Sequence, residues 1–301
     1  MSRKYGAPYI GSKNNIAEKV IDFLPAGKRL CDLFGGGGAI SHCALTYGRN
    51  KYRSVLYNDY NPMVVEYVKD AFSGKFNMDE NEPEIISRED FKALKDKRGD
   101  VAFLWSFGNN GMDYLWGEDK EELKLSAFAM LTRRSISERY KWYKRFMSAL
   151  KRCDLSRLME KDERTVNRLQ SIERLQSIEA IERLQSIHQP QSAGRIQFSN
   201  ISYADYKYKD GDIVYCDIPY ENAKGKVHYA DFDHKAFYEW ACAQPYPVFI
   251  SSYEVSDERL EGVVIAKRNQ LLSKTSDNER LERIFMNKAA VERKKQEVLF
   301  V

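Results

Sequence analysis

The sequence predicts an α/β protein whose mostly parallel sheet is interrupted by a mainly helical insert. In residues 1–73, short apolar runs typical of strands alternate with stretches typical of helices, and strand-like runs return after Gln197. Alternation of this kind indicates a parallel sheet covered by helices. Residues 74–195 are instead highly charged and mostly helical by pattern. We therefore expect one core, formed by residues 1–73 and 196–301, with residues 74–195 inserted into it.

The amino-terminal part is expected to form a β-loop-α-β-α unit. Its predicted elements are a strand at 29–34, a glycine loop at 35–38, a helix at 39–47, a strand at 54–57 and a helix at 62–72. Pro62 is typical of the first turn of a helix, and the apolar periodicity after it continues that helix. In the carboxyl-terminal part, strands are predicted at 213–216, 247–251, 263–266, 282–286 and 297–301.

The insert contains predicted helices at 88–97, 121–131 and 136–151, and a near-repeat, RLQSIERLQSIEAIERLQSI, at 168–187. Apolar residues occupy every third position of this repeat tract. An α-helix turns through about 300° in three residues, so such a stripe winds around a helix and keeps to no single face. A helix that packs on several sides and a set of irregular stacked turns both fit the pattern.

Composition excludes several classes of protein. The 301 residues are 43% hydrophobic, which is enough for a core, but no apolar run approaches the length of a membrane span. The five cysteines include no CxxC pair, which favours reduced thiols in a cytoplasmic compartment. The four histidines are scattered and no His/Cys cluster has the spacing of a zinc site, so we expect chemistry without a metal.

A basic segment rich in aromatic residues lies between Arg133 and Arg152. It contains eight basic residues against one acid, Glu138, and four aromatic residues are interleaved with them. Binding to nucleic acid needs such a combination of phosphate neutralisation and ring contacts. An amphipathic helix with its charges in water and its rings on the core is an equally good interpretation of this segment alone.

The stretch CDLFGGGGAIS at residues 31–41 predicts a ligand site. Glycines between a strand and a helix let the backbone approach a ligand closely, with amide groups pointing at it. Open α/β sheets bind ligands at this carboxyl end of their strands. Asp59 follows the next strand, and an acid there suits the two hydroxyls of a ribose. Dinucleotides and S-adenosylmethionine both fit, and the simpler alternative is a structural turn.

The stretch DIVYCDIPY at residues 212–220 ends an apolar strand with an acid, a proline and an aromatic ring. Such a group suits an exocyclic amine whose lone pair is delocalised into an aromatic ring. Asp217 and the carbonyl of residue 218 would accept hydrogen bonds from the two N–H groups, which favours a more nucleophilic nitrogen. Pro219 would aim that carbonyl, and Tyr220 would stack on an extruded base. In isolation, an ordinary turn explains the same residues.

Together, these stretches resemble the Dam-like DNA adenine-N6 methyltransferases of the phage and prophage branch, with the D-P-P-Y motif present as D-I-P-Y. YIGSKNNIAEKV (9–20) is similar to the family's amino-terminal motif, and FGNNGM (107–112) to the segment before its recognition helices. SYADY (202–206) resembles the stretch upstream of the catalytic strand. YADFDHKAFYEWA and VFISSY resemble the segments that follow the catalytic motif.

The resemblance implies a Rossmann-like, S-adenosylmethionine-dependent methyltransferase sheet. Residues 74–195, with the repeat tract 168–187, would form its inserted target-recognition region. The implied reaction transfers a methyl group from S-adenosylmethionine to N6 of adenine in double-stranded DNA, with base flipping, in a bacterial or phage-infected cell. RNA-adenine and protein-glutamine methyltransferases share the catalytic logic, and a catalytically weak DNA-binding relative is a third alternative. Whether a partner restriction endonuclease exists is left open by the resemblance.

Residue roles follow from matching these motifs. The implied catalytic residues are Asp217, Ile218 through its carbonyl, Pro219 and Tyr220. The implied cofactor-binding residues are Tyr9, Lys13, Asp32, Phe34, Gly36, Gly38, Asp59 and Asp205, with Lys13 near the cofactor's carboxylate. The implied DNA-binding residues are Asn110, Arg133, Arg134, Arg139, Lys141, Lys144 and Arg145. Ile218 replaces a proline of the usual motif, and because only its backbone carbonyl is used we expect an active enzyme.

Overall fold

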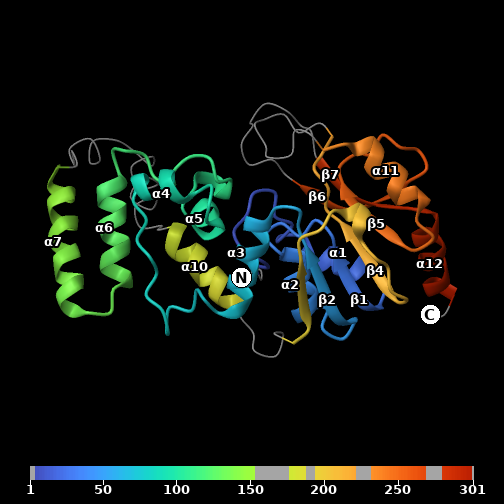
Figure 1. The fold of residues 1–301 in the computed structure, drawn as a ribbon, viewed down its shortest axis with the longest axis horizontal. Helices are drawn as coiled ribbons and strands as arrows, with labels where there is room; N and C mark the ends of the chain where they lie inside the picture. The colour runs from blue at the N-terminus through green and yellow to red at the C-terminus, as the bar shows by residue number, and fades with distance from the viewer. Residues whose placement is uncertain (1–3, 153–175, 188–193, 222–231, 269–279, 300–301) are drawn as a thin grey trace. The chain divides into compact units, whose positions relative to one another are not determined.

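The computed structural model describes residues 4–152, 176–187, 194–221, 232–268 and 280–299. The chain divides into two compact units. The first, here called the sheet unit, comprises Met1–Gly6, Ser12–Val65 and Pro190–Val301. The second, the helical unit, comprises Ala7–Gly11 and Glu66–Gln189. Figure 1 labels most of the helices and strands of both units and colours the chain from blue at the N-terminus to red at the C-terminus.

The sheet unit contains a seven-stranded sheet in the order β3-β2-β1-β4-β5-β7-β6. Its strands are β1 (Gly27–Asp32), β2 (Tyr52–Asn58), β3 (Ile196–Ser199), β4 (Asp212–Cys216), β5 (Val248–Ser252), β6 (Glu261–Arg268) and β7 (Arg280–Met286). The strands from β3 to β5 in this order are parallel, whereas β7 runs antiparallel to β5 and β6. The order of strands reverses between β1 and β4, and open α/β sheets bind ligands beside such a point. The predicted Rossmann-like fold class is confirmed.

Helices cover both faces of this sheet. The helices of the unit are α1 (Ala17–Phe23), α2 (Ala39–Thr46), the short η3 (Tyr203–Asp205), α11 (His234–Ala243) and α12 (Lys288–Leu299), and α3 (Pro62–Ser73) begins here. Helix α2 lies on the face toward which Asp32 points, since the Ser41 hydroxyl donates to that carboxylate over 2.8 Å. Helix α11 lies on the other face, where Phe237 packs in one cluster with Cys31 and Val214. Neighbouring residues of a strand point to opposite faces, so Cys31 and Asp32 serve different layers.

The carboxyl-terminal end differs from the prediction. A strand is predicted at 297–301, but the chain is helical from Lys288 to Leu299, so this prediction is wrong. The residues before the apolar run are mostly Ala, Glu, Lys and Gln, which favour a helix. A short apolar run cannot be told from part of a helix by its pattern, and the preceding turns carry the helix into it.

The helical unit is built around buried aromatic rings. Its elements are α4 (Arg88–Leu94), α5 (Gly99–Leu104), the short η1 (Phe107–Asn109), α6 (Glu121–Thr132), α7 (Ile136–Arg152) and α10 (Gln176–Ile187). The ring of Trp105 meets those of Trp116 and Phe128 edge-on, with centroids 5.6 and 5.2 Å apart. Such pairs add to the stability that burial of the rings provides. Ser87 and Asp90 form a reciprocal capping box that determines where α4 begins.

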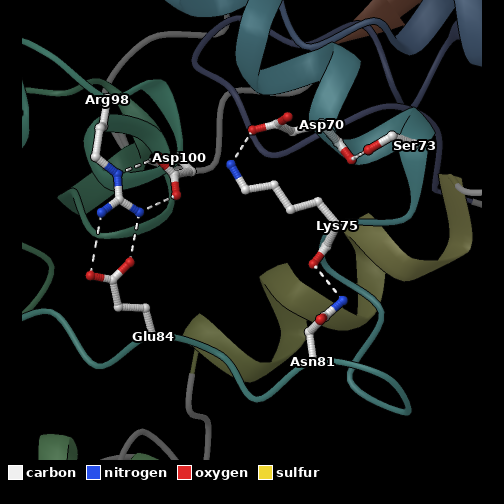
Figure 2. Close-up of polar contacts among 7 residues, drawn as sticks. All are labelled: Asp70, Ser73, Lys75, Asn81, Glu84, Arg98 and Asp100. Atoms are coloured by element: carbon white, nitrogen blue, oxygen red, sulfur yellow. Dashed lines mark hydrogen bonds and ion pairs between the residues drawn. The ribbon is translucent and has the colours of Figure 1, made fainter.

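Ion pairs tie together the segment between α3 and α5, as Figure 2 shows. The Lys75 ammonium lies 2.5 Å from the carboxylate of Asp70 in α3. Arg98, just before α5, lies 2.7 Å from both Asp100 and Glu84. Hydrogen bonds to Asp100 and Glu84 raise the pKa of the Arg98 guanidinium. One arginine therefore joins the long connection after α3 to the start of α5.

Part of the repeat tract is helical. Residues 176–187 form α10, whereas residues 168–175 lie outside the described residues. Ile181, Leu184 and Ile187 are all buried, so the period-three stripe of α10 faces protein. A stripe that shifts by about 60° at each step stays within half of the helix surface over so few residues. A helix this short can therefore bury the whole stripe.

Candidate active site

Three of the predicted acids lie at the carboxyl edge of the parallel sheet. Asp32 ends β1, Asp59 follows β2, and Asp217 follows β4, and the parallel register brings these strand ends together. The buried Asn58, at the end of β2, ties the ends of β1 and β3 to it, because its side-chain amide donates to the carbonyl of Leu33 and to a carbonyl after β3, over 3.0 Å each. The predicted glycine loop and D-I-P-Y motif are thus neighbours at one edge.

The glycine loop is held against β2. Gly36 donates its backbone N–H to Asp59 over 2.9 Å, and its carbonyl accepts from the Tyr57 hydroxyl over 2.6 Å. Gly36 and Gly38 have φ angles of 48° and 71°, in the left-handed region that favours glycine. A Cβ atom on Gly35 would lie 2.2 Å from the Tyr57 ring. Both packing and backbone conformation therefore require glycines here, and the loop presents backbone without side chains.

Two of the acids predicted to bind the cofactor accept hydrogen bonds from the protein itself. Asp59 is 5% exposed and accepts from the backbone N–H groups of Gly36 and Asn61, over 2.9 Å each. Asp32 is 1% exposed and accepts from the Ser41 hydroxyl. Burial raises the pKa of both carboxyls, and that of Asp32 to about 7. Burial therefore favours the protonated form of Asp32.

Phe34, just before the glycine loop, belongs to a cluster of aromatic rings. It stacks on Tyr203 with ring centroids 5.8 Å apart, and Phe237 meets it edge-on at 5.5 Å. Tyr203 lies in η3, the SYADY segment that also carries Asp205. Asp205 is exposed. Ring contacts thus join two segments, 31–41 and 202–206, that the resemblance assigns to one cofactor.

A buried ion pair links the D-I-P-Y motif to the amino-terminal motif. Lys13 is 3% exposed, and its ammonium lies 2.6 Å from Asp217 Oδ1 and 2.8 Å from the Tyr220 hydroxyl. It also lies 3.7 Å from Oε1 of Glu282, a fully buried residue of β7. Burial raises the pKa of the Tyr220 phenol, so this hydroxyl stays protonated and can donate to Glu282, 3.4 Å away. A buried cation is costly unless it is paired, and two carboxylates pair this one.

The backbone of the D-I-P-Y motif is anchored by its neighbours. Ile218 is 3% exposed and packs in the core cluster with α11, so the residue that replaces a proline contributes to the core. The Pro219 carbonyl accepts a hydrogen bond from His234 Nε2 over 2.7 Å, which requires the proton on that nitrogen. The Tyr220 ring stacks on Tyr253, with centroids 4.2 Å and planes 18° apart.

Three residues of this cluster are not predicted from the sequence: Glu282, His234 and Tyr253. Glu282 stands in the strand RLERIFM, and a charged residue within a buried apolar strand is a signal that could reveal it. Tyr253 follows β5 directly, at the same kind of strand end that predicts Asp217. His234 opens α11, and nothing local in the sequence marks it.

The predicted DNA-binding residues in α7 and in the segment just before it fall into two groups. Arginines engaged within the helical unit are Arg133 (with Glu82), Arg134 (with Glu82 and the Met78 carbonyl), Arg139 (with the Arg133 carbonyl) and Arg145 (with Glu122). Lys141 and Lys144 are exposed, and the Lys144 ammonium lies 4.5 Å from the Tyr140 ring centroid. Tyr140 and Tyr143 are 56% and 45% exposed. The alternative in which the rings of α7 face a core is therefore wrong for these two tyrosines.

Two further predicted residues, Tyr9 and Asn110, belong to the helical unit. The Tyr9 ring meets Phe103 edge-on with centroids 5.0 Å apart. The Asn110 side chain accepts from the Met112 backbone N–H over 2.9 Å, within a tight turn where Asn109 has a φ of 54°. FGNNGM is thus a compact turn whose asparagines hold the backbone.

Comparison with known proteins decides the family. A family model described as D12 class N6 adenine-specific DNA methyltransferase matches residues 9–243. The chain belongs to this family. This DNA adenine-N6 methyltransferase therefore acts on DNA, as the motifs predict, and its family and fold imply S-adenosylmethionine as the methyl donor.

Other comparisons add little to this assignment. Two solved structures of the rRNA methyltransferase AviRa from Streptomyces viridochromogenes are 14% and 13% identical in sequence to this chain. Each match covers 91% of this chain and 82% of the other, with TM-scores of 0.36 and 0.35, a similarity too low to support a conclusion. A search of curated proteins gave no match.

No group of three or more His, Cys, Asp or Glu side chains is placed to hold a metal ion among the residues that the structure describes. None of the described helices is long and apolar enough to span a bilayer.

Proposed function

We propose that the site at the sheet edge transfers a methyl group from S-adenosylmethionine to N6 of an adenine in double-stranded DNA, with that adenine turned out of the duplex. The observation that carries this proposal is the contact between Lys13 and Asp217. A nitrogen donor already lies 2.6 Å from this carboxylate, beside the Tyr220 hydroxyl. The exocyclic amine of adenine would donate to the same carboxylate oxygen.

Asp217 and the Ile218 carbonyl would each accept one N–H of the target amine. Two acceptors draw the hydrogens out of the plane of the base, which frees the nitrogen lone pair for attack. S-adenosylmethionine, when bound, supplies an electrophilic methyl group on sulfur. Asp217 then lies where it can accept the proton that the methylated nitrogen releases. A neutral amine needs no general base before it attacks, so Asp217 acts as acceptor and orienting group.

Tyr220 would stack on the extruded adenine. Its ring is supported on one face by Tyr253 at 4.2 Å, and a base would lie against the other face. Pro219 and the hydrogen bond from His234 would keep the adjacent backbone, and with it the Ile218 carbonyl, in a fixed direction. Pre-organisation of this kind is what positions a weak nucleophile for reaction.

The glycine loop and its acids fit the methyl donor. Gly36 and Gly38 present backbone that no side chain shields, and such loops approach cofactors closely. The residues proposed to hold the cofactor are those the resemblance implies: Tyr9, Lys13, Asp32, Phe34, Gly36, Gly38, Asp59 and Asp205. Asp59 would bind the ribose hydroxyls and Asp205 the amino group of the cofactor's adenine, and the stacking of Phe34 on Tyr203 supports one continuous site.

The helical unit would read the target sequence. Its α7 presents Lys141 and Lys144, which suit phosphates, next to the exposed rings of Tyr140 and Tyr143, which suit bases or sugars. The four engaged arginines would shape this surface instead of contacting DNA directly. Residues 74–195 are proposed as the recognition region on this basis.

The test of the proposed function uses Asp217→Ala in the full-length protein. Duplex DNA is incubated with S-adenosylmethionine and enzyme, and N6-methyladenine is measured by mass spectrometry of the digested nucleosides. We expect product from the unaltered protein and from the control Asp210→Ala, an exposed acid before β4, and at least about a thousandfold less from Asp217→Ala. Methylation by Asp217→Ala at the unaltered rate would contradict the catalytic assignment. Methylation of RNA or of glutamine alone would contradict the substrate.

A further inference from the structure

Glu282 is a buried acid that the reaction described above does not use. It lies on β7 with no solvent exposure, and Ser251 of the neighbouring β5 donates to its Oε1 over 2.8 Å. Its other oxygen, Oε2, faces the Tyr220 hydroxyl at 3.4 Å. An acid is almost never buried in a strand unless its charge is compensated. The nearby cation is the Lys13 ammonium, 3.7 Å from Oε1.

The Lys13 ammonium occupies a hydrogen-bonding position on Asp217 that the target amine needs. Its ammonium is 2.6 Å from Asp217, the carboxylate that must accept an N–H of the target amine. The ammonium is held to this carboxylate by a hydrogen bond and by the attraction of opposite charges, whereas the neutral amine of adenine offers the hydrogen bond alone, so adenine competes poorly with the ammonium for that oxygen. Lys13 is also buried, so it cannot simply turn into water without moving the chain around it. A second acceptor inside the protein is needed to receive it.

We propose that Glu282 is a positioning residue that draws the Lys13 ammonium away from Asp217, which leaves this carboxylate to accept the hydrogen bond of the target amine. This inference rests on the proposed role of Asp217. A shift of the ammonium by about 1 Å would convert the 3.7 Å ion pair into a hydrogen bond of ordinary length. Ser251 holds Glu282 in place for this exchange, and the Tyr220 hydroxyl, within 2.8 Å of the ammonium, can follow it.

The geometry also gives each of the two carboxylates a separate use. With the substrate absent, one ammonium compensates two acids, and the closer of them is Asp217. With the amine bound, Asp217 gains a new donor and Glu282 keeps the cation. The number of buried charges is the same in both arrangements, because the ammonium stays inside the protein and the target amine is neutral.

The test is a double-mutant cycle with four proteins: the unaltered enzyme, Glu282→Gln, Lys13→Met and the double variant. Single-turnover methylation of duplex DNA is measured at saturating S-adenosylmethionine, so that weaker cofactor binding does not enter the rate. Glutamine keeps the shape of Glu282 and an oxygen for Ser251 but attracts the ammonium less. We expect Glu282→Gln to slow transfer about tenfold or more when Lys13 is present, and by less than about twofold when residue 13 is methionine.

A purely structural role for Glu282 predicts a different result, namely the same loss in both backgrounds, and that outcome would overturn the inference. So would a Lys13→Met enzyme that transfers no methyl group at saturating cofactor, because a competitor of the amine cannot be indispensable. Ser251→Ala provides a second variant, expected to slow transfer severalfold only when Lys13 is present. Glu261→Gln, on an exposed acid of β6, is the matched control. Activity of Asp217→Ala would instead defeat the proposed function, so the two failures are distinguishable.

Discussion

Asp32 should make the methyltransferase less stable as the pH rises toward neutrality. Burial raises the pKa of this carboxyl to about 7 in the folded protein, against an ordinary value of 3.8. Between these two pH values the folded chain holds a proton that the unfolded chain has released, so the free energy of unfolding falls as the pH rises. Each pH unit costs about 1.4 kcal/mol, which amounts to about 4 kcal/mol above pH 7.

The perturbation is Asp32→Asn, which removes the ionisation and keeps an oxygen for the Ser41 hydroxyl. From pH 5 to pH 8 the stability of this variant relative to the unaltered protein should rise by about 2–3 kcal/mol. Hydrogen exchange of the β1 and β4 amides in urea, without cofactor, reports the sheet unit by itself. The control is Asp210→Asn. A surface hydrogen bond from Lys28 lowers the pKa of the Asp210 carboxyl, so this variant should gain no stability relative to the unaltered protein as the pH rises. Equal effects of Asp32→Asn on the free energy of unfolding at pH 5 and pH 8 would show that the ionisation of Asp32 does not contribute to the pH dependence.

Two further predictions concern the glycine loop and α7. Gly35→Ala should destabilise the sheet unit by about 3 kcal/mol, because the added Cβ would lie 2.2 Å from the ring of Tyr57. It should also weaken S-adenosylmethionine binding, as measured by calorimetry. The control Gly194→Ala, whose Cβ would have nothing within 4 Å, should have neither effect. Replacement of Lys141 and Lys144 by glutamine should reduce the slope of log Kd against log salt for duplex DNA by about 2. Arg145→Gln should change that slope less, since its guanidinium is already paired at 2.9 Å; an equal change would show that Arg145 reaches phosphate.

Local signals in the sequence were sufficient to predict which residues lie at the carboxyl edge of the sheet. Glycines after one strand and Asp-Ile-Pro-Tyr after another mark the places where strands end, and strand ends of a parallel sheet share an edge whatever the rest of the fold does. The confirmed fold class and family follow from these signals. Prediction failed where the signal was ambiguous: the apolar run at 297–301 looks like a strand, and only the helix formers before it make it the end of α12. The four-residue β3 is not predicted at all, because so short a strand carries little periodicity.

The class of sheet, and the residues that end its strands at the edge carrying the glycine loop and the D-I-P-Y motif, could therefore be predicted from the sequence, because backbone conformation and side-chain alternation are local properties. Tertiary structure alone decided which of these residues meet. Lys13 contacts Asp217 across 204 positions of the chain, and Glu282 joins them from an antiparallel strand. It also decided that Arg133 and Arg145 bind acids of their own unit while Lys141 remains exposed. Contacts between distant residues depend on strand order and register, and these are set by the packing of the whole core.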